Sequence, residues 1–373
     1  MAMSSQARPR VLVLGGGYGG IAVAKGLDDI ADVTLVEPKD AFVYNVAALR
    51  ALVAPEWLPK IFLPYDRLLQ HGRVLRDSVI RLEGKRATLA SGGTIDGDFV
   101  VLATGSSYPF PAKSDLPDTA SAQERYRNAQ RALASARRVL ILGAGAVGLE
   151  LAGEIAAAWP QKHIAIVDLA SDILPGGYRP ELRAELRRQL DEMGVELILG
   201  SPLHHQPPSP AGALAPFTGH TEAGVEVRAD IWFQAYGIAP VTNYLAGDLV
   251  TLRTAEGSIE VTPTMGLPGQ EGMFAIGDIA AGHPNGAGRA GRHGDLVAAN
   301  IRALITGEGT MAEAPMTPPA IVLPLGPEGG AGQRPNQEQL LGPSEVAAIK
   351  GRDMMIDRYA QFLGVLQLDT ETP

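Results

Sequence analysis

Two stretches of the chain share one order of apolar, glycine and polar positions. In the first, RVLVLGGG (10–17) predicts a buried strand that runs into a glycine turn, and the small residues of 18–27 are typical of a helix packed on a sheet. DVTLVE (32–37) then predicts a second strand that ends at Glu37. Strand, helix and strand within about 30 residues form a β-α-β unit of the kind that binds dinucleotides.

The same order returns later in the chain. RRVLILGAG (137–145) predicts a strand and turn, AVGLELAGEIAAAW (146–159) a helix, and HIAIVD (163–168) a strand that ends at Asp168. After each unit comes a segment that predicts a hairpin-like strand pair entering a loop, first TIDGDFVVLATGSS (94–107) and then VRADIWFQAYGIAP (227–240).

GMFAIGD (272–278) and a helix near 287–305 predict a return to the first unit after the second is complete. The predicted fold class is therefore α/β, with two Rossmann-like dinucleotide-binding domains, the second inserted in the first, and a small C-terminal domain. The predicted boundaries are 1–115 and 239–306 for the first domain, 116–238 for the inserted domain and 307–373 for the C-terminal domain.

The first glycine turn carries the spacing GxGxxG at Gly15, Gly17 and Gly20, directly after a strand and at the start of a helix. The first glycine permits the tight turn, the second lets the backbone approach a pyrophosphate, and the third brings helix and strand together. Glu37 then stands where a carboxylate accepts hydrogen bonds from the adenosine ribose. The alternative is a glycine-rich turn that binds nothing, but it does not explain why three glycines, an acidic residue and the flanking strand and helix all occur together.

Gly143, Gly145 and Gly148 repeat the spacing in the second unit, and Asp168 takes the acidic position. A carboxylate there accepts from a free 2′-hydroxyl and repels a 2′-phosphate, so the second site is expected to prefer NADH. NADPH stays an alternative, because Arg179 or Arg183 could turn toward a 2′-phosphate.

Composition narrows the function classes. The 373 residues contain no cysteine, which excludes disulfides, thiolate zinc sites and catalytic dithiols. A net charge of −9 without a Lys/Arg-rich run argues against a nucleic-acid partner. No apolar run approaches the roughly 20 residues of a membrane span, and the first residues lack the apolar centre of a secretory signal. We therefore expect a cytoplasmic protein.

Several other polar and apolar positions have an ordinary structural interpretation. Glu150 and Glu154 are four residues apart on one helix face, and for Glu154 a solvated position is expected. His204 and His205 lack acidic or cysteine partners at metal spacing, so no metal site is predicted. Met355, Tyr359, Phe362 and Leu366 form an apolar stripe that is expected to pack on the protein itself, with peripheral membrane contact or a homodimer as alternatives.

The order of GGGYGG, LATGSS, GAGAVGLE and MFAIGD resembles the pyridine nucleotide-disulfide oxidoreductase superfamily in its branch without a redox disulfide. NVAALRA (45–51), LATGSSYPFPAK (102–113), VGLELAGEI (147–155) and AIGDIA (275–280) narrow the resemblance to the ferroptosis-suppressor, or apoptosis-inducing-factor-like mitochondrion-associated, flavoproteins, which are related to type II NADH dehydrogenases. The resemblance covers most of the chain and thins after about residue 335.

This resemblance implies FAD in the first unit and NADH in the second. It assigns Asp278 to the FAD ribitol, Thr104 and Gly105 to the loop beside FAD, and Glu150 to NAD(P)H binding. It also places Asn45 and Arg50 beside the flavin and the helix of His293 at its pyrimidine edge. The predicted catalytic residues are Glu150, His293 and Lys350, and the predicted cofactor-binding residues are Gly15, Gly17, Gly20, Glu37, Asn45, Arg50, Thr104, Gly105, Gly143, Gly145, Gly148, Asp168, Gly237, Gly277 and Asp278. For Lys350 an exposed position, and for His293 a core or capping role, are the alternatives.

The implied activity is hydride transfer from NADH to the flavin followed by electron transfer to a quinone-like acceptor. Because Arg289 and Arg292 stand where the family tends to be apolar, reduction of a soluble aromatic metabolite is a second hypothesis. A third is a flavin-bearing signalling protein that responds to NADH. The acceptor face is expected to be lined by NVAALRA, the helix start at 286–293 and the segment 320–333, with Val322 and Leu323 near the cofactor.

Overall fold

The computed structural model describes residues 8–316 and 318–365. A six-stranded sheet forms its first part, in the order β18-β19-β9-β1-β2-β5, and every neighbouring pair is parallel except β18 with β19. Three of its strands, RVLVL, DVTLV and FVVL, are nearly continuous apolar runs, because both faces of a parallel sheet are covered. The strands are β1 (Arg10–Leu14), β2 (Asp32–Val36), β5 (Arg73–Leu75), β9 (Phe99–Leu102), β18 (Gly266–Leu267) and β19 (Gln270–Ala275).

Helices α1 (Tyr18–Leu27) and α6 (Ala287–Thr306) pack against each other. Glycines make this contact close, since a Cβ on Gly294 would lie 2.5 Å from the Gly19 carbonyl oxygen. Near the same domain lie α2 (Ala48–Val53), the two-stranded pair β3 (Ala41–Val43) and β4 (Phe62–Pro64), and the short 3₁₀ turns η1 (Asn45–Ala47), η2 (Pro55–Trp57), η3 (Pro59–Ile61), η4 (Gly247–Leu252) and η5 (Gly277–Ile279).

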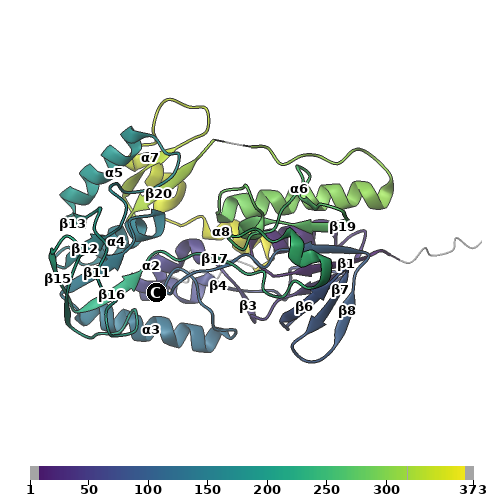
Figure 1. Ribbon diagram of the computed structural model, residues 1–373, viewed down its shortest axis with the longest axis horizontal. Helices are drawn as coiled ribbons and strands as arrows, with labels where there is room; N and C mark the ends of the chain where they lie inside the picture. The colour runs from purple at the N-terminus through teal and green to yellow at the C-terminus, as the bar shows by residue number, and fades with distance from the viewer. Residues whose placement is uncertain (1–7, 317, 366–373) are drawn as a thin grey trace, which may run out of the picture.

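A second parallel sheet has the order β13-β12-β11-β16, built from β11 (Arg138–Leu142), β12 (His163–Val167), β13 (Val195–Ile198) and β16 (Ile231–Gln234). Its helices are α3 (Thr119–Ser135), α4 (Ala146–Ala158) and α5 (Pro180–Glu192). Figure 1 shows these teal elements at one end of the molecule and the purple and green elements of the first sheet at the other.

The chain crosses between the two ends at a small antiparallel pair. Strand β10 (Ser106–Ser107) leaves the first sheet and pairs with β17 (Ala239–Pro240), which returns from the second. The nested order of two Rossmann-like units is thus confirmed, since strands before residue 103 and after residue 265 share one sheet. The exact domain boundaries stay a prediction.

The hairpin interpretation of 94–107 and 227–240 is wrong. Strand β8 (Thr94–Asp96) belongs to a separate sheet with β6 (Val79–Glu83) and β7 (Arg86–Leu89), whereas β9 enters the main parallel sheet. In the second unit β15 (Glu226–Ala229) pairs with β14 (Phe217–His220), and β16 enters the parallel sheet. Short polar breaks, Gly97-Asp98 and Asp230, let the chain change sheets where the pattern alone suggested a turn between partners.

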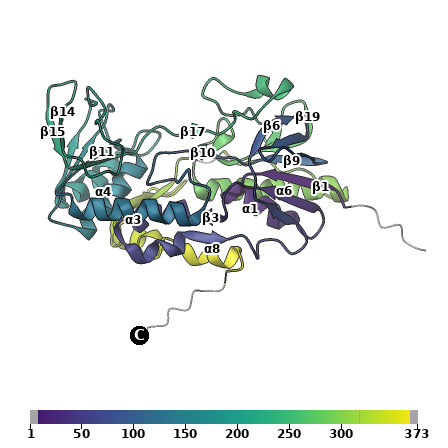
Figure 2. The same cartoon turned by 90° about the horizontal axis from the view of Figure 1, so that it is seen from below.

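The C-terminal segment packs mainly on the second unit. A hairpin of β20 (Ile321–Leu325) and β21 (Gly329–Gln333) contacts α4 and α5, and is followed by α7 (Pro343–Val346), the π-helix η6 (Ala347–Gly351) and α8 (Ile356–Phe362). Both views show the yellow α8 apart from this hairpin, alongside the first unit (Figures 1 and 2). The chain therefore passes from one unit to the other between residues 346 and 356.

This placement corrects part of the expected acceptor face. Leu323 is completely buried, and the side chain of Gln189 in α5 both donates to the Gly330 carbonyl at 3.0 Å and accepts from the Gly330 N–H at 2.6 Å. A Cβ on Gly330 would lie 2.2 Å from the Leu323 carbonyl oxygen, so this glycine is required for hairpin packing. The hairpin packs on α4 and α5 of the second unit and on α7 and η6, which follow it in the chain.

The apolar stripe at the C-terminus packs on the protein, as expected, through Tyr359. Its ring stacks on Phe42 with centroids 5.8 Å apart and meets the edge of Tyr18 at 5.2 Å. The stripe is not one helix, because Met355 has a positive φ of 55° and α8 begins only at Ile356. The last predicted member, Leu366, lies outside the described residues.

Candidate functional site

The first glycine loop is fixed by the carboxylate at the end of β2. Glu37 accepts the Gly16 N–H on Oε2 at 2.6 Å and the Lys39 N–H on Oε1 at 3.0 Å, and its side chain is buried. The hydroxyl of Tyr65 donates to the Gly16 carbonyl at 2.8 Å from the other side. The carboxylate is thereby held beside the loop, with its remaining lone pairs directed by these bonds.

The second glycine loop repeats this arrangement. Asp168 accepts the Ala144 N–H on Oδ2 at 2.5 Å and the Ala170 N–H on Oδ1 at 2.7 Å. In both units an acidic side chain therefore binds the residue after the first glycine and the residue two places beyond itself. The two loops are equivalent in geometry as well as in sequence.

The glycines of both loops divide into two kinds. A Cβ on Gly20 would lie 1.8 Å from the Gly15 carbonyl oxygen, and one on Gly148 would lie 1.9 Å from that of Gly143, so helix and loop touch at these positions. Around Gly17 and Gly145 a Cβ would meet nothing within 4 Å. The middle glycine of each loop thus borders open space at a helix N-terminus, as a pyrophosphate site requires.

A cavity of about 310 Å³ lies over the first loop. Its lining combines the loop and strand end with the segment that leaves β9, and includes Gly15, Glu37, Thr104, Lys113 and Tyr244. The Thr104 hydroxyl donates to the Val241 carbonyl at 2.7 Å, which ties this loop to the chain that returns from the second unit. Thr104 therefore lines the cavity and Gly105 follows it in the chain, while their contact with FAD stays a prediction.

Asp278 contacts two residues that line this cavity, Ser106 and Lys113, and holds three groups in all. The Ser106 hydroxyl donates to its Oδ2 at 2.6 Å, the Lys113 ammonium lies 3.2 Å from the same oxygen, and the Gly286 N–H donates to Oδ1 at 3.3 Å. Burial lowers the pKa of Lys113, and the charge of Asp278 opposes that effect. The aspartate thus joins the AIGD turn (275–278) to Ser106, which follows the ATG loop (103–105), and to the start of α6.

These cradles fit the predicted cofactors. The first, with its cavity, its clamped glutamate and Asp278, fits FAD, and the second fits the pyrophosphate and ribose of NAD(H). Gly277 takes a positive φ of 72° at the turn before Asp278, and Gly237 takes one of 93° after β16. Asn45 starts η1 next to Val46, whose N–H donates to the Tyr18 hydroxyl at 3.2 Å. The individual cofactor contacts stay predictions.

The structure brings Glu150 and Lys350 together. Lys350 Nζ lies 2.8 Å from Glu150 Oε1, and both side chains are mostly buried, at 13% and 14% exposure. The alternative of an exposed lysine is therefore wrong. Glu150 stands in the second turn of α4, the helix that begins at the second glycine loop, and Lys350 stands in η6. Residues 200 positions apart in the chain form one ion pair.

Arg50 and Glu154 are placed differently from the expectation. Glu154 is buried at 2% exposure and forms an ion pair with Arg50, because α4 is covered by α2 and β20 and has no solvated face at this turn. The solvated position predicted for Glu154 is wrong. The guanidinium of Arg50 is used by Glu154 and by the Gly351 carbonyl, so this arrangement does not support a direct contact between Arg50 and the flavin.

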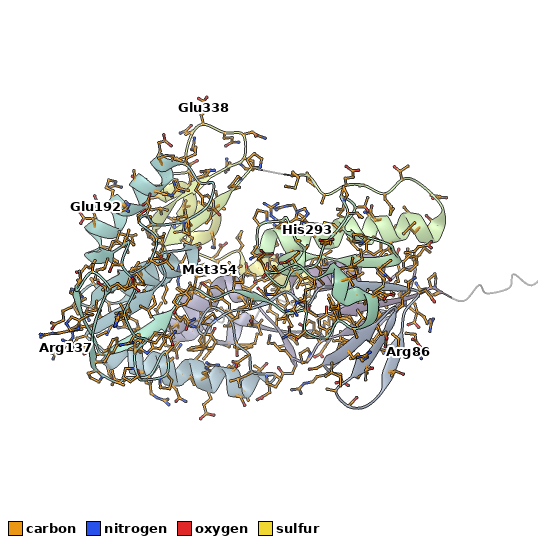
Figure 3. All side chains as sticks on the ribbon, in the orientation of Figure 1. Arg86, Arg137, Glu192, His293, Glu338 and Met354 are labelled. Carbon is orange, nitrogen blue, oxygen red and sulfur yellow. The ribbon has the colours of Figure 1, made fainter. Side chains whose placement is uncertain are left out.

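His293 is buried at 5% exposure in α6, and Figure 3 shows it near the middle of the molecule. Its Nδ1 accepts the Gly277 N–H at 3.4 Å, and its ring meets the edge of His283 at 4.8 Å. Burial lowers the pKa of His293 to about 4, with His283 and two arginines adding to the effect. A neutral histidine that caps the AIGD turn matches the structural alternative; a catalytic role stays a prediction.

Some neighbours of the site were not identified from the sequence. Tyr65 and Tyr44 carried no spacing signal, because each acts across the fold on a backbone carbonyl. Lys113 could have been identified from the sequence, because it is the last residue of the motif LATGSSYPFPAK. His204 and His205 are exposed, as expected. Among residues 8–316 and 318–365, no group of three or more His, Cys, Asp or Glu residues could hold a metal ion, and no helix is long and apolar enough to cross a membrane.

Two equivalent glycine loops with clamped carboxylates, one nested in the other's fold, define a protein of the two-dinucleotide-binding class. A sequence model described as pyridine nucleotide-disulphide oxidoreductase matches residues 9–294, and the chain belongs to this family. FAD and NAD(P)H are the cofactors of the family. The disulphide of the family name has no counterpart here, because the chain has no cysteine.

The relatives confirm the narrower resemblance. The chain is 31% identical to apoptosis-inducing factor homolog B of Dictyostelium discoideum over 372 residues, covering 94% of this chain and 96% of the relative. It is 30% identical to ferroptosis suppressor protein 1 of Taeniopygia guttata over 362 residues, covering 95% and 96%. The sulfide:quinone oxidoreductase of Aquifex aeolicus has the same fold, with a TM-score of 0.74 at 15% identity over 95% of this chain and 91% of that one.

Proposed function

We propose that this oxidoreductase takes electrons from NADH and delivers them to a quinone. The observation that carries the proposal is the Glu150–Lys350 ion pair, which stands in the second turn of the helix that begins at the second glycine loop. A nicotinamide dinucleotide whose pyrophosphate occupies that loop would present its reactive end toward the first unit. The quinone is what the resemblance to ferroptosis-suppressor proteins implies, and the relatives of that name support it.

Bound FAD would supply the redox chemistry, accepting a hydride from NADH and passing electrons onward. The first glycine loop, Glu37 and Asp278 would hold it, and the second loop with Asp168 would hold NADH. Since the chain has no cysteine pair, the acceptor must receive electrons from the cofactor directly.

Lys350 is proposed to act at the acceptor. Its ammonium has three N–H donors, of which Glu150 Oε1 occupies one at 2.8 Å, so donors remain for an oxygen that gains negative charge. Glu150 fixes the direction of the ammonium and balances its charge. In a site that is mostly closed to water, such a preorganised donor stabilises developing charge better than solvent does.

The test is an anaerobic stopped-flow measurement of both half-reactions with a short-chain quinone. We expect fast cofactor reduction by NADH, followed by reoxidation that is much faster with quinone than with oxygen. Lys350→Met should slow the reoxidation step and leave the reduction step nearly unchanged. Quinone turnover no faster than the oxygen background would refute the proposal and favour a signalling role.

A second candidate acceptor is an anionic aromatic metabolite. Arg289 and Arg292 are three residues apart at the start of α6, and burial and the charge of Arg292 lower the pKa of Arg289. The charge of Arg289 also opposes the burial that raises the pKa of Tyr178 in the second unit. An anionic acceptor would be recognised there, and Arg292→Gln should raise KM for a carboxylated quinone while leaving KM for a neutral one unchanged.

A further inference from the structure

A buried ion pair connects three separate parts of the chain. Arg50 in α2 donates from Nη2 to Glu154 Oε1 at 2.8 Å and to the Gly351 carbonyl at 2.8 Å, and its Nε donates to the other oxygen of Glu154. The exposure of the two side chains is 6% and 2%. The planar guanidinium therefore binds a carboxylate from α4 and a backbone oxygen from η6 at the same time.

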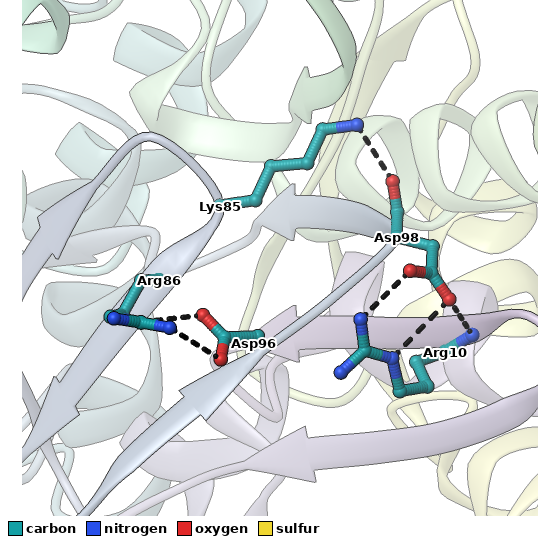
Figure 4. Close-up of polar contacts among 5 residues, drawn as sticks. All are labelled: Arg10, Lys85, Arg86, Asp96 and Asp98. Carbon is teal, nitrogen blue, oxygen red and sulfur yellow. Dashed lines mark hydrogen bonds and ion pairs between the residues drawn. The ribbon is translucent and has the colours of Figure 1, made fainter.

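This pair is unlike the ion pairs at the surface. Arg10–Asp98 and Arg86–Asp96, drawn in Figure 4, have side-chain exposures of 53% and 47%, and of 66% and 38%. Exposed pairs form at little desolvation cost and contribute little to stability. A buried pair carries a large desolvation cost, which an apolar pair of similar volume would avoid. Stability alone therefore gives no reason for charges at positions 50 and 154.

The partners of Arg50 are immediate neighbours of the Glu150–Lys350 pair. Gly351 follows Lys350 directly, and Glu154 stands one helical turn after Glu150 on α4. The guanidinium thus holds the two backbone segments that carry the lysine and the glutamate. Burial raises the pKa of Glu154, the hydrogen bond and charge of Arg50 oppose this, and the charges of Glu150 and Lys350 act on it more weakly.

A second side chain of the first unit holds the same segment. The Tyr44 hydroxyl donates to the Met354 carbonyl at 2.6 Å, and the Met354 N–H donates to the Lys350 carbonyl at 2.8 Å. Met354 lies centrally in the molecule (Figure 3) and has a positive φ of 51°. Gly351 is pressed against the turn of the β20–β21 hairpin, where a Cβ would lie 2.5 Å from the Pro327 carbonyl oxygen. Residues 350–354 are therefore held on both sides.

We propose that Arg50, which reaches across the junction of the two dinucleotide-binding units to pair with Glu154, is a positioning residue that sets the Lys350 ammonium against Glu150. This inference rests on the proposed function, which gives the Glu150–Lys350 ion pair its role at the acceptor. Without the guanidinium, the Gly351 carbonyl loses its donor and α4 loses its ion pair with α2. Lys350 then keeps its charge and loses its fixed place, and a displacement of about 1 Å is enough to slow a reaction up to a hundredfold.

The experiment compares full-length, FAD-loaded variants. Arg50→Met/Glu154→Met removes both charges together and leaves no unpaired buried charge, so it is expected to fold. Arg50→Lys keeps a cation for Glu154, but a point charge cannot bind the carboxylate and the Gly351 carbonyl as the planar fork does. Arg86→Met/Asp96→Met is the matched control at the surface, where the same change removes an exposed pair.

Two readouts are taken on each variant. The first is amide hydrogen exchange of peptides that cover 347–354, which is expected to accelerate by about tenfold or more in both Arg50 variants, because the segment opens locally more often. The second is the pair of half-reactions, in which quinone reduction should fall by about tenfold or more while reduction by NADH changes by less than about twofold. The surface control should match the wild type in both.

The outcomes separate the two proposals. If the Arg50 variants exchange at the wild-type rate in 347–354 and reduce quinone normally, the pair is only structural and the inference is wrong. Faster exchange in 347–354 with both half-reactions at the wild-type rate would also overturn the inference, because the segment would then be less ordered and catalysis would not depend on its order. If the wild type itself fails to reduce quinone, the proposed function fails, and unchanged exchange in the variants still refutes the positioning role independently.

Discussion

Replacing Asp168 by asparagine tests how the second site chooses between NADH and NADPH. The change keeps the size and shape of the side chain but removes its charge. Asp168 now accepts two backbone N–H groups, from Ala144 at 2.5 Å and from Ala170 at 2.7 Å. Asparagine has one acceptor oxygen, so it can keep only one of these bonds and offers an amide donor in place of the other.

The magnitude follows from the chemistry of a charged acceptor. A hydrogen bond to a charged group contributes about 1.5–3 kcal/mol, and the half-buried position of Asp168 argues for the lower part of that range. Asp168→Asn should lose the charged hydrogen bond to the ribose of NADH and the repulsion of the 2′-phosphate of NADPH. The preference for NADH over NADPH should therefore fall by roughly 1–2 kcal/mol. That corresponds to a change of about 5- to 30-fold in the ratio of kcat/KM values.

The assay measures kcat/KM for NADH and NADPH with a common acceptor, in the wild type, Asp168→Asn and Asp172→Asn. Asp172 is the matched control, because it is a nearby acid whose Oδ1 is already paired with Arg187 at 2.7 Å. Equal use of both donors by the wild type, or no change in Asp168→Asn, would refute the reasoning. In that case Arg183 would not readily explain the binding of a 2′-phosphate, because its Nη2 already donates to the Gly176 carbonyl at 2.8 Å.

Three further outcomes are expected. Asp278→Ala should weaken FAD retention, measured as bound flavin after dilution, because the variant loses the acceptor of three groups; full retention would contradict this role. His293 should carry stability that is complete above about pH 6.5 and is lost as the pH falls toward about 4, since only the unfolded chain binds the proton in that window; between pH 7.5 and pH 5 the wild type should lose about 2 kcal/mol of this stability, measured by denaturant unfolding, His293→Gln should lack the loss, and an equal loss in both proteins would count against it. Gly330→Ala should lower the free energy of unfolding by at least about 2 kcal/mol because of its φ of 119° and the contact with Leu323, whereas Gly342→Ala, with a φ of −80° and only the Glu345 carboxylate within 4.0 Å of the added Cβ, should cost less than about 1 kcal/mol; equal effects would show that the hairpin adapts.

The nested fold could be predicted because the signals that define it are local. Each β-α-β unit places its glycines, its apolar strand and its acidic strand end within a few dozen residues. Each of these features meets a specific geometric requirement of the dinucleotide-binding fold. Gly20 and Gly148 show why, since any side chain there would overlap the loop. The return to the first sheet through β19 was visible for the same reason, as a short apolar run that ends at Gly277 and Asp278.

The parts that could not be predicted depend on contacts between distant segments. Glu154 looked like a solvated helix position because the spacing of α4 does not show that α2 and the β20 hairpin cover it. Its partner Arg50 is 104 positions away, and no pattern within either helix links the two. The prediction of strand pairs at 94–107 and 227–240 was wrong for the same reason, because strands that are adjacent in sequence belong to different sheets.

The two glycine loops share one clamp but differ in how far the clamping carboxylate is buried, and that difference agrees with the two ways in which the loops are proposed to be used. In the first loop Tyr65 closes over Gly16, so tightly that a Cβ there would lie 2.6 Å from the hydroxyl, and Glu37 is only 7% exposed. In the second loop an alanine occupies the equivalent place, and Asp168 is half-buried. A cofactor that stays through many turnovers needs the closed cradle, and one that enters and leaves in every turnover needs the open one. Under the proposed function, the unit with the tyrosine would hold the resident cofactor and the other unit the exchanging one, and the two would meet at the junction held by Arg50.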